Sequence, residues 1–260
     1  MPRQVVTLAI VQSRRTSDPR DNLARMSRHL EGVGAADVVL LAENWLADHL
    51  VSWQEYLESV TALSNLLPPQ TLLAGGAQYV RAPEVVSRGA FLRAGTVVAR
   101  YEKLFPSRAV GERGVFRPGV EAPVVEHGGV RLAAVVCVDL FYPEVVRRLA
   151  LAGAVLVLNP ASIPYSRVSL WQALGRVRAA ENTIFVAMAC NTGTYYPDGR
   201  AVSGGSFVAY PDGRPVLPLG SGEGVFTVSL DLDLVAQVRE RWPYLEDVRT
   251  KGLPCSADTR

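Results

Sequence analysis

The chain has 260 residues, of which 48% are hydrophobic and 20% charged, and its formal net charge is +2. This composition is typical of a globular protein with a sizeable core, and without a long run of one charge it gives no indication of a nucleic-acid or membrane partner. We expect no transmembrane segment, because no apolar run approaches the roughly 18 to 20 residues that span a bilayer. We also expect no signal peptide, because the N-terminus leads directly into a strand pattern.

The cysteines and histidines argue against two kinds of site. The three cysteines are odd in number and widely spaced, which disfavours a disulfide framework or a CxxC metal site: Cys137, Cys190 and Cys255. The three histidines lack the spacing of metal ligands. We therefore expect no bound metal and a reducing, cytoplasmic setting.

Strand and helix patterns alternate along the first half of the chain. Apolar runs predict strands at 4–11, 37–42 and 71–74, and helical periodicity predicts helices at 22–30 and 53–67. Residues 87–92 and 96–101 have the pattern of a hairpin, and a polar loop rich in glycine and proline follows at 105–122.

The second half continues the alternation. Strands are predicted at 130–136, 154–158, 184–189 and 224–230, with a turn at 211–214 between two further short strands. Helices are predicted from 143, at 169–183 and at 232–241. In the second of these, one face is apolar and carries Leu170, Leu174, Val177 and Ala180. We expect one α/β domain over residues 1–250 with a mixed sheet, and an irregular C-terminal tail over 251–260.

Cys137 lies where a predicted buried strand ends, shortly before a helix that begins at Pro143. Ligand crevices of open α/β sheets lie outside the carboxyl ends of the strands, and a helix N-terminus favours a thiolate over a thiol. A buried and inert cysteine fits the same local pattern, because free cysteine is often buried.

Two other reactive side chains, Glu43 and Lys103, also follow strand patterns. Each alone fits a solvated surface residue. Together with Cys137 they supply what acyl transfer by a thiol requires. Glu43 can act as base and then as acid, while Lys103 and the backbone N–H of Val138 can hold the oxyanion.

These residues stand in motifs that resemble the nitrilase superfamily of carbon–nitrogen hydrolases. The segments that carry the resemblance are LLAE at 40–43, YEK at 101–103, CVDLFYPE at 137–144, NPAS at 159–162, RAAEN at 178–182 and NTG at 191–193. The three catalytic motifs occur in the order of that superfamily, and the resemblance extends over nearly the whole chain.

The resemblance implies a four-layer αββα sandwich, in which two mixed β-sheets carry helices on their outer faces. It also implies that subunits associate into homodimers or larger assemblies. Cys137 is then the nucleophile, Glu43 the general base and Lys103 the residue that stabilises the oxyanion, with no organic cofactor. A second glutamate is expected in the loop after the lysine; Glu112 is the best match.

Several positions depart from the superfamily pattern, which weakens any inference about the substrate from one branch. Ala42 replaces a common proline, Val138 an aromatic or small polar residue, and Phe141–Tyr142 an Arg-Phe pair. The expected substrate is a small amide: a linear amide, an ω-amido acid or an N-carbamoyl compound. The residues expected to contact it are Val138, Phe105, Tyr142 and Tyr165.

Three alternatives remain open at this point. The chain could hydrolyse a nitrile, or it could be a binding or regulatory relative that keeps the fold without turnover. A Cys–His hydrolase is the third, and it requires His49 or His127 beside Cys137. Competing candidates for the second glutamate are Glu102 and Glu121.

Overall fold

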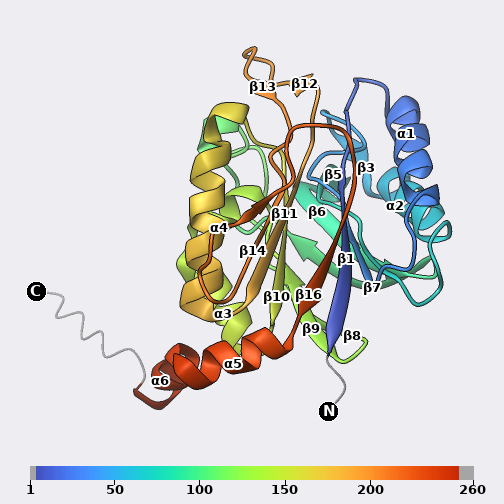
Figure 1. Ribbon diagram of the computed structural model, residues 1–260. Helices are drawn as coiled ribbons and strands as arrows, with labels where there is room; N and C mark the ends of the chain where they lie inside the picture. Colours follow the sequence, from blue (N-terminus) through green and yellow to red (C-terminus); the bar gives the residue numbers. More distant parts are fainter. Residues whose placement is uncertain (1–3, 252–260) are drawn as a thin grey trace, which may run out of the picture.

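Two β-sheets pack face to face, and helices cover both outer faces (Figure 1). The structure is a computed structural model that describes residues 4–251. Helices α1 and α2 lie on one side and α3 and α4 on the other, so the layers are helix, sheet, sheet, helix. This arrangement confirms the predicted αββα sandwich.

The first sheet has eight strands in the order β16-β1-β2-β4-β6-β5-β3, with β7 paired to β6. It is mixed, because β1, β2 and β4 run parallel while β16 and β6 are antiparallel to their neighbours. Its strands are β1 (Val5–Gln12), β2 (Val38–Leu40), β3 (Val51–Ser52), β4 (Leu72–Ala74), β5 (Gln78–Ala82), β6 (Glu84–Arg93), β7 (Thr96–Glu102) and β16 (Gly224–Asp231).

The second sheet has six strands in the order β15-β14-β11-β10-β9-β8, and a separate two-stranded hairpin joins β12 to β13. The strands are β8 (Val124–His127), β9 (Val130–Ala134), β10 (Leu156–Ala161), β11 (Phe185–Cys190), β12 (Thr194–Tyr195), β13 (Ala201–Val202), β14 (Phe207–Ala209) and β15 (Leu217–Pro218).

Six α-helices and three short 3₁₀ helices complete residues 4–251. The α-helices are α1 (Pro19–Glu31), α2 (Trp53–Ser64), α3 (Pro143–Leu151), α4 (Val168–Asn182), α5 (Asp233–Arg241) and α6 (Tyr244–Lys251), and the 3₁₀ helices are Arg108–Val110, Cys137–Phe141 and Tyr165–Arg167. None of the helices in this range is long and apolar enough to cross a bilayer.

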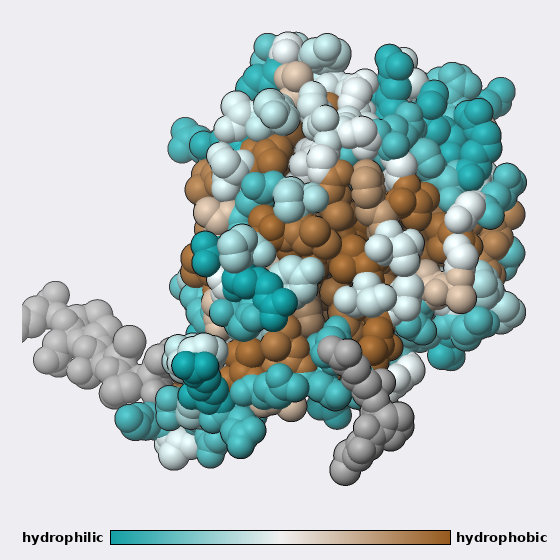
Figure 2. All heavy atoms as spheres, viewed as in Figure 1, coloured by the Kyte–Doolittle hydropathy of each residue, from teal (hydrophilic) through white to brown (hydrophobic). Residues whose placement is uncertain are grey.

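Strand β1 shows why the apolar runs are continuous. Leu8 and Ile10 face the layer between the two sheets, whereas Ala9 and Val11 face helices α1 and α2. Successive side chains of a strand point to opposite faces, so a strand that is covered on both faces needs apolar residues throughout. On the surface of the molecule, hydrophobic residues gather over β14 and β16, where the edges of the two sheets approach each other (Figure 2).

The face of α4 that carries Leu170 and Val177 points to solvent: Leu170 is 38% exposed and Val177 is 50% exposed. The buried face instead carries Gly175 and Ala179. A Cβ on Gly175 would lie 2.3 Å from the Phe207 ring, so the helix approaches β14 more closely than large side chains allow. Of the predicted stripe, Leu170 and Val177 therefore face solvent, whereas Leu174 packs partly against the core.

Other predicted boundaries differ by a few residues. Helix α1 begins earlier than expected, because the Asp18 side chain caps it by accepting from the Arg20 N–H. Strands β3, β5, β8, β12 and β13 and helix α6 had no sequence prediction. Lys251, assigned to the tail, is the last residue of α6, and the rest of the predicted tail lies outside the described residues.

Candidate active site

Glu43 stands in the loop that follows β2, at the carboxyl end of a parallel strand. Its neighbour Asn44 has a φ of 53°, a left-handed conformation that asparagine adopts more readily than most residues. Gly76, with a φ of 71°, lies against Ala42, where a Cβ would be 2.1 Å from the carbonyl oxygen. Asn191 at the end of β11 donates to the Glu43 carbonyl oxygen at 2.7 Å. The loop is therefore fixed from both sheets.

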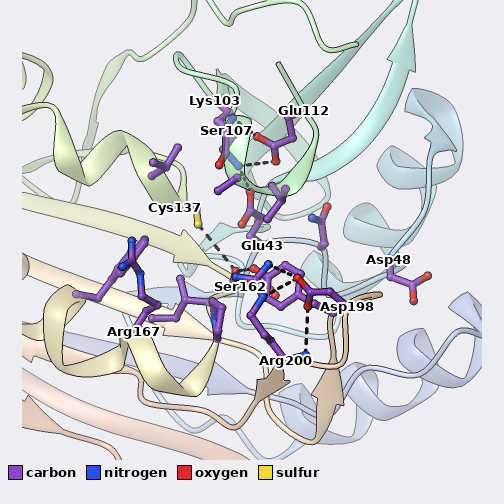
Figure 3. A pocket seen from close by; sticks show the side chains of 18 of the residues that line it. Glu43, Asp48, Lys103, Ser107, Glu112, Cys137, Ser162, Arg167, Asp198 and Arg200 are labelled. Atoms are coloured by element: carbon purple, nitrogen blue, oxygen red, sulfur yellow. Dashed lines mark hydrogen bonds and ion pairs between the residues drawn. The ribbon is translucent and has the colours of Figure 1, made fainter. Parts of the chain in front are cut away.

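Lys103 follows β7, and the structure brings it between two carboxylates. Its Nζ lies 3.0 Å from Glu43 Oε1 and 2.7 Å from Glu112 Oε1. All three side chains are buried. Figure 3 shows Glu43 between Lys103 and Cys137, so the carboxylate faces both the ammonium group and the thiol.

The second glutamate at this site is Glu112, from the loop after β7. Besides Lys103, its carboxylate accepts from Tyr79 Oη at 2.7 Å and from the Ser107 N–H at 2.5 Å. Glu102 instead forms ion pairs with Arg88 and Arg117. Sequence reasoning missed Tyr79 because strand β5, which carries it, was not predicted.

Cys137 opens the 3₁₀ helix that links β9 to α3, and its φ is 47°. Cysteine rarely adopts this left-handed conformation, so the surrounding structure must hold the turn. Asn159 on β10 does so by donating to the carbonyl oxygens of Val135 at 2.7 Å and of Cys137 at 3.2 Å. The thiol Sγ is directed toward the Ser162 carbonyl oxygen, 4.0 Å away.

Asp139 ties the nucleophile turn to the segment that carries Lys103. Its carboxylate accepts from the N–H groups of Leu104 and Phe105, both at 2.9 Å, and from Val136 at 3.2 Å. Burial raises the pKa of this carboxyl to about 7. Since both sheets contribute to these contacts, Asp139 positions one half of the site against the other.

Burial dominates the electrostatics of the site. It raises the pKa of Glu43, and the neighbouring Lys103 ammonium only partly offsets that effect. Burial and the Glu43 charge also raise the pKa of the Cys137 thiol well above its usual value. Burial alone would lower the pKa of Lys103, but the nearby negative groups raise it well above the ordinary value. The resting site therefore holds a thiol and an ammonium group, and not the thiolate that a helix N-terminus would favour.

A cavity of about 1130 Å³ opens beside these residues. Of the side chains expected to contact the substrate, Val138 and Tyr142 line it. Phe105 does not, because its ring stacks on Tyr142 with centroids 3.7 Å apart. Tyr165 also lies outside the lining and is 61% exposed. Two of the four residues predicted to contact the substrate thus line the cavity, and the other two do not.

Sequence reasoning missed part of the cavity wall. Arg15 after β1, Trp171 on α4 and Tyr196 in the β12–β13 hairpin all line it. Tyr196 Oη donates to the Ser162 carbonyl oxygen. Figure 3 shows Ser162, Asp198 and Arg200 on the side of Glu43 opposite Lys103. Arg15, Tyr196, Asp198 and Arg200 belong to none of the motifs recognised in the sequence, so only the packing of their loops brings them to the cavity.

The histidines lie away from the thiol. His49 pairs with Asp48, and His127 is on β8, and neither lines the cavity. This placement removes the geometric basis for a Cys–His hydrolase. Among residues 4–251 there is no group of three or more histidine, cysteine, aspartate or glutamate side chains that could hold a metal ion.

Two relatives with named activities are similar over most of the chain. The 2-oxoglutaramate amidase of Bacillus subtilis (strain 168) is 27% identical, with 89% of this chain and 92% of the relative covered. An (R)-stereoselective amidase of Pseudomonas sp is 32% identical, with 88% and 87% covered. Both names support hydrolysis of an amide C–N bond.

The amidase of Nesterenkonia sp. AN1, from the nitrilase superfamily, has the same fold. A mutant of it superimposes with a TM-score of 0.73 and 28% identity, covering 95% of each chain. In another mutant, with a TM-score of 0.76, 26% identity and coverage of 91% and 96%, the acetamide moiety of fluoroacetamide is attached covalently to the active-site cysteine. Residues 7–240 of the present chain match the carbon–nitrogen hydrolase family, and the chain belongs to that family, within the nitrilase superfamily.

Proposed function

We propose that this protein hydrolyses the C–N bond of a small amide through a thioester on Cys137. The observation that carries the proposal is the buried ion-pair network beside the thiol, in which Lys103 Nζ lies 3.0 Å from Glu43 and 2.7 Å from Glu112. A carboxylate and a cation that meet at a cavity next to a thiol provide a base, an oxyanion partner and a nucleophile.

In the first half of the reaction, Sγ of Cys137 attacks the amide carbon while the Glu43 carboxylate takes the thiol proton. The raised pKa of Glu43 makes it a better proton acceptor than an ordinary carboxylate. The Lys103 ammonium and the Val138 N–H hold the oxyanion. Collapse of the intermediate breaks the C–N bond, and the proton on Glu43 goes to the leaving ammonia or amine.

In the second half, Glu43 takes a proton from a water molecule as its oxygen attacks the thioester carbon. Lys103 again stabilises the oxyanion. Collapse expels the Cys137 sulfur, which recovers a proton from Glu43, and the carboxylic acid product leaves. Atoms balance as amide plus water giving acid plus ammonia or amine, and the enzyme returns to its starting protonation state.

Glu112 is assigned a positioning role in this mechanism. Its carboxylate bridges the Lys103 ammonium and the Tyr79 hydroxyl, which is held protonated because burial raises the pKa of Tyr79 well above its usual value. This contact restricts the direction in which the ammonium group points. A fixed donor needs less reorganisation as charge develops on the substrate oxygen.

The test is ammonia release by the purified protein from a panel of linear amides, ω-amido acids, N-carbamoyl amino acids and nitriles. The relatives' names favour amides, and the 2-oxoglutaramate amidase favours an ω-amido acid. We expect release that disappears in the Cys137→Ala variant while its circular dichroism spectrum stays unchanged. Release that persists in this variant contradicts the thioester mechanism, and a protein that releases nothing from any compound is not an amidohydrolase of these substrates.

Self-association is a further part of the proposal. The outward face of α4 exposes Leu170 and Val177, and burial of such a face against a second copy would remove apolar surface from water. Light scattering after size exclusion measures the mass, and Val177→Glu is expected to shift a dimer toward monomer. A wild-type protein that elutes as a monomer at all concentrations contradicts it.

A further inference from the structure

Arg15 is a buried cation that the mechanism does not use. It stands in the loop after β1, lines the cavity beside Glu43 and is only 7% exposed. Its Nη1 donates to the Asn44 carbonyl oxygen at 3.1 Å, and its Nε is buried without a hydrogen-bond partner. No carboxylate of residues 4–251 forms an ion pair with it. Arg15 is therefore a largely buried guanidinium without an ion-pair partner among the described residues.

The other cations of the cavity differ from Arg15. Lys103 has two carboxylate partners. Arg200 is paired with Asp198 at 2.7 Å, and Arg167 is exposed to solvent. Exposure to solvent or a neighbouring carboxylate thus compensates each of these three charges, whereas Arg15 is buried and has no ion-pair partner among the described residues. A buried charge without a partner is unfavourable, so proteins seldom keep one unless a ligand completes it.

We propose that Arg15 binds a carboxylate at the end of the substrate opposite the scissile amide. This inference rests on the proposed function and narrows it to amides that carry a carboxylate, in preference to uncharged linear amides. A guanidinium presents a planar set of N–H donors that fits a carboxylate. One hydrogen bond from Nη1 to Asn44 leaves further N–H donors of the two Nη groups for a ligand. Two carboxylates of the lining lie outside the Lys103 network: Asp48 is exposed and paired with His49, so water screens it, and Asp198 is paired with Arg200.

The test compares two substrates of the same length. Glutaramate has a carboxylate where pentanamide has a methyl group. For Arg15→Met, we expect kcat/KM for glutaramate to fall by about 10- to 100-fold, mainly through KM, as for loss of a hydrogen-bonded charge. For pentanamide we expect a change within about twofold, because its methyl end makes no such bond. Arg15→Lys should recover part of the glutaramate activity, because it retains the charge.

Arg14→Met is the matched control, because Arg14 is adjacent in sequence but exposed and outside the cavity lining. It should leave both substrates unaffected. An equal loss for glutaramate and pentanamide in Arg15→Met would show that Arg15 only supports the Glu43 loop through Asn44, and would overturn the proposal. Unchanged kinetics on glutaramate would overturn it as well.

Binding separates this inference from the proposed function. Isothermal titration of glutaramate into Cys137→Ala measures recognition without turnover, and adding Arg15→Met should weaken binding by about 10-fold or more. If the wild type releases no ammonia but this Arg15-dependent binding is present, the proposed function fails and the inference stands. If glutaramate is hydrolysed through Cys137 but Arg15→Met does not weaken its binding, the inference fails and the proposed function stands. An absence of binding overturns the inference whatever the activity.

Discussion

Two charged parts of the cavity lining are balanced in opposite ways. Around Lys103, a cluster that we call the inner end, the ammonium group is held between Glu43 and Glu112, and every charged group has a partner within 3.0 Å. Arg15 is buried in the same lining with one backbone hydrogen bond and no ion-pair partner among residues 4–251. The inner end is complete before any ligand arrives, whereas Arg15 lacks a counter-charge. The comparison suggests that the protein supplies the chemistry by itself and relies on the substrate to complete recognition.

Removal of the base tests the inner end most severely. In Glu43→Gln, the amide cannot accept the thiol proton, and we expect kcat to fall by roughly 10²- to 10⁴-fold, the usual contribution of a general base. The fall in kcat is measured as steady-state ammonia release, with the rate of the Cys137→Ala variant subtracted as the blank. A Glu43→Gln variant that turns over at a normal rate would show that the inner end is not the reaction centre.

The pH dependence of kcat/KM is a second test of Glu43 as the base. Glu43 must be ionised to accept a proton, and burial raises its pKa above the ordinary 4.5. Activity should therefore be full above this raised pKa and be lost as the pH falls through it, so that the acid limb of kcat/KM lies above pH 4.5. A profile that stays flat down to pH 4.5 would mean that the acid limb does not come from a buried carboxylate.

Glu112→Gln weakens the inner network without touching the thiol. It replaces a charged partner of Lys103 by a neutral amide, and we expect kcat to fall by about 10- to 100-fold with a smaller change in KM. Glu121→Gln serves as the control, since Glu121 is an exposed glutamate of the same loop. Equal effects in the two variants would assign the loss to the loop and not to the contact with Lys103.

Tyr79→Phe should have the smallest effect. It deletes only the hydroxyl that donates to Glu112 at 2.7 Å, and the expected cost is about 1 kcal/mol, or roughly fivefold in kcat. The double variant with Glu112→Gln should lose little more than Glu112→Gln alone, because both changes remove the same contact. Additive losses would indicate that Tyr79 acts on the reaction by another route.

The positions of Glu43, Lys103 and Cys137 could be read from the sequence because each follows a predicted strand, and strands that run in one direction bring their carboxyl ends to the same edge of a sheet. Lys103 carries an additional signal: it and Lys251 are the only lysines among the 27 basic Lys and Arg residues of the chain. Glu112 could be selected from its position in the loop, although only the structure distinguishes it from Glu102.

The recognition residues could not be read in the same way. Arg15 is one of many arginines, and its burial follows from how the loop after β1 packs against Asn44. Phe105 and Tyr165 are aromatic residues of predicted loops, but loop geometry turns one onto Tyr142 and the other to solvent. Periodicity likewise located the apolar stripe of α4 without showing that this face is exposed.

The site is divided between the two sheets, and this division has a consequence for folding. Glu43 and Lys103 belong to the segments of the first sheet, Cys137 to those of the second, and Asp139 joins them. A chain whose halves have folded but not docked has a thiol with no base beside it. We therefore expect reactivity to require the docking of the two sheets, and the recovery of amidase activity during refolding would report that docking.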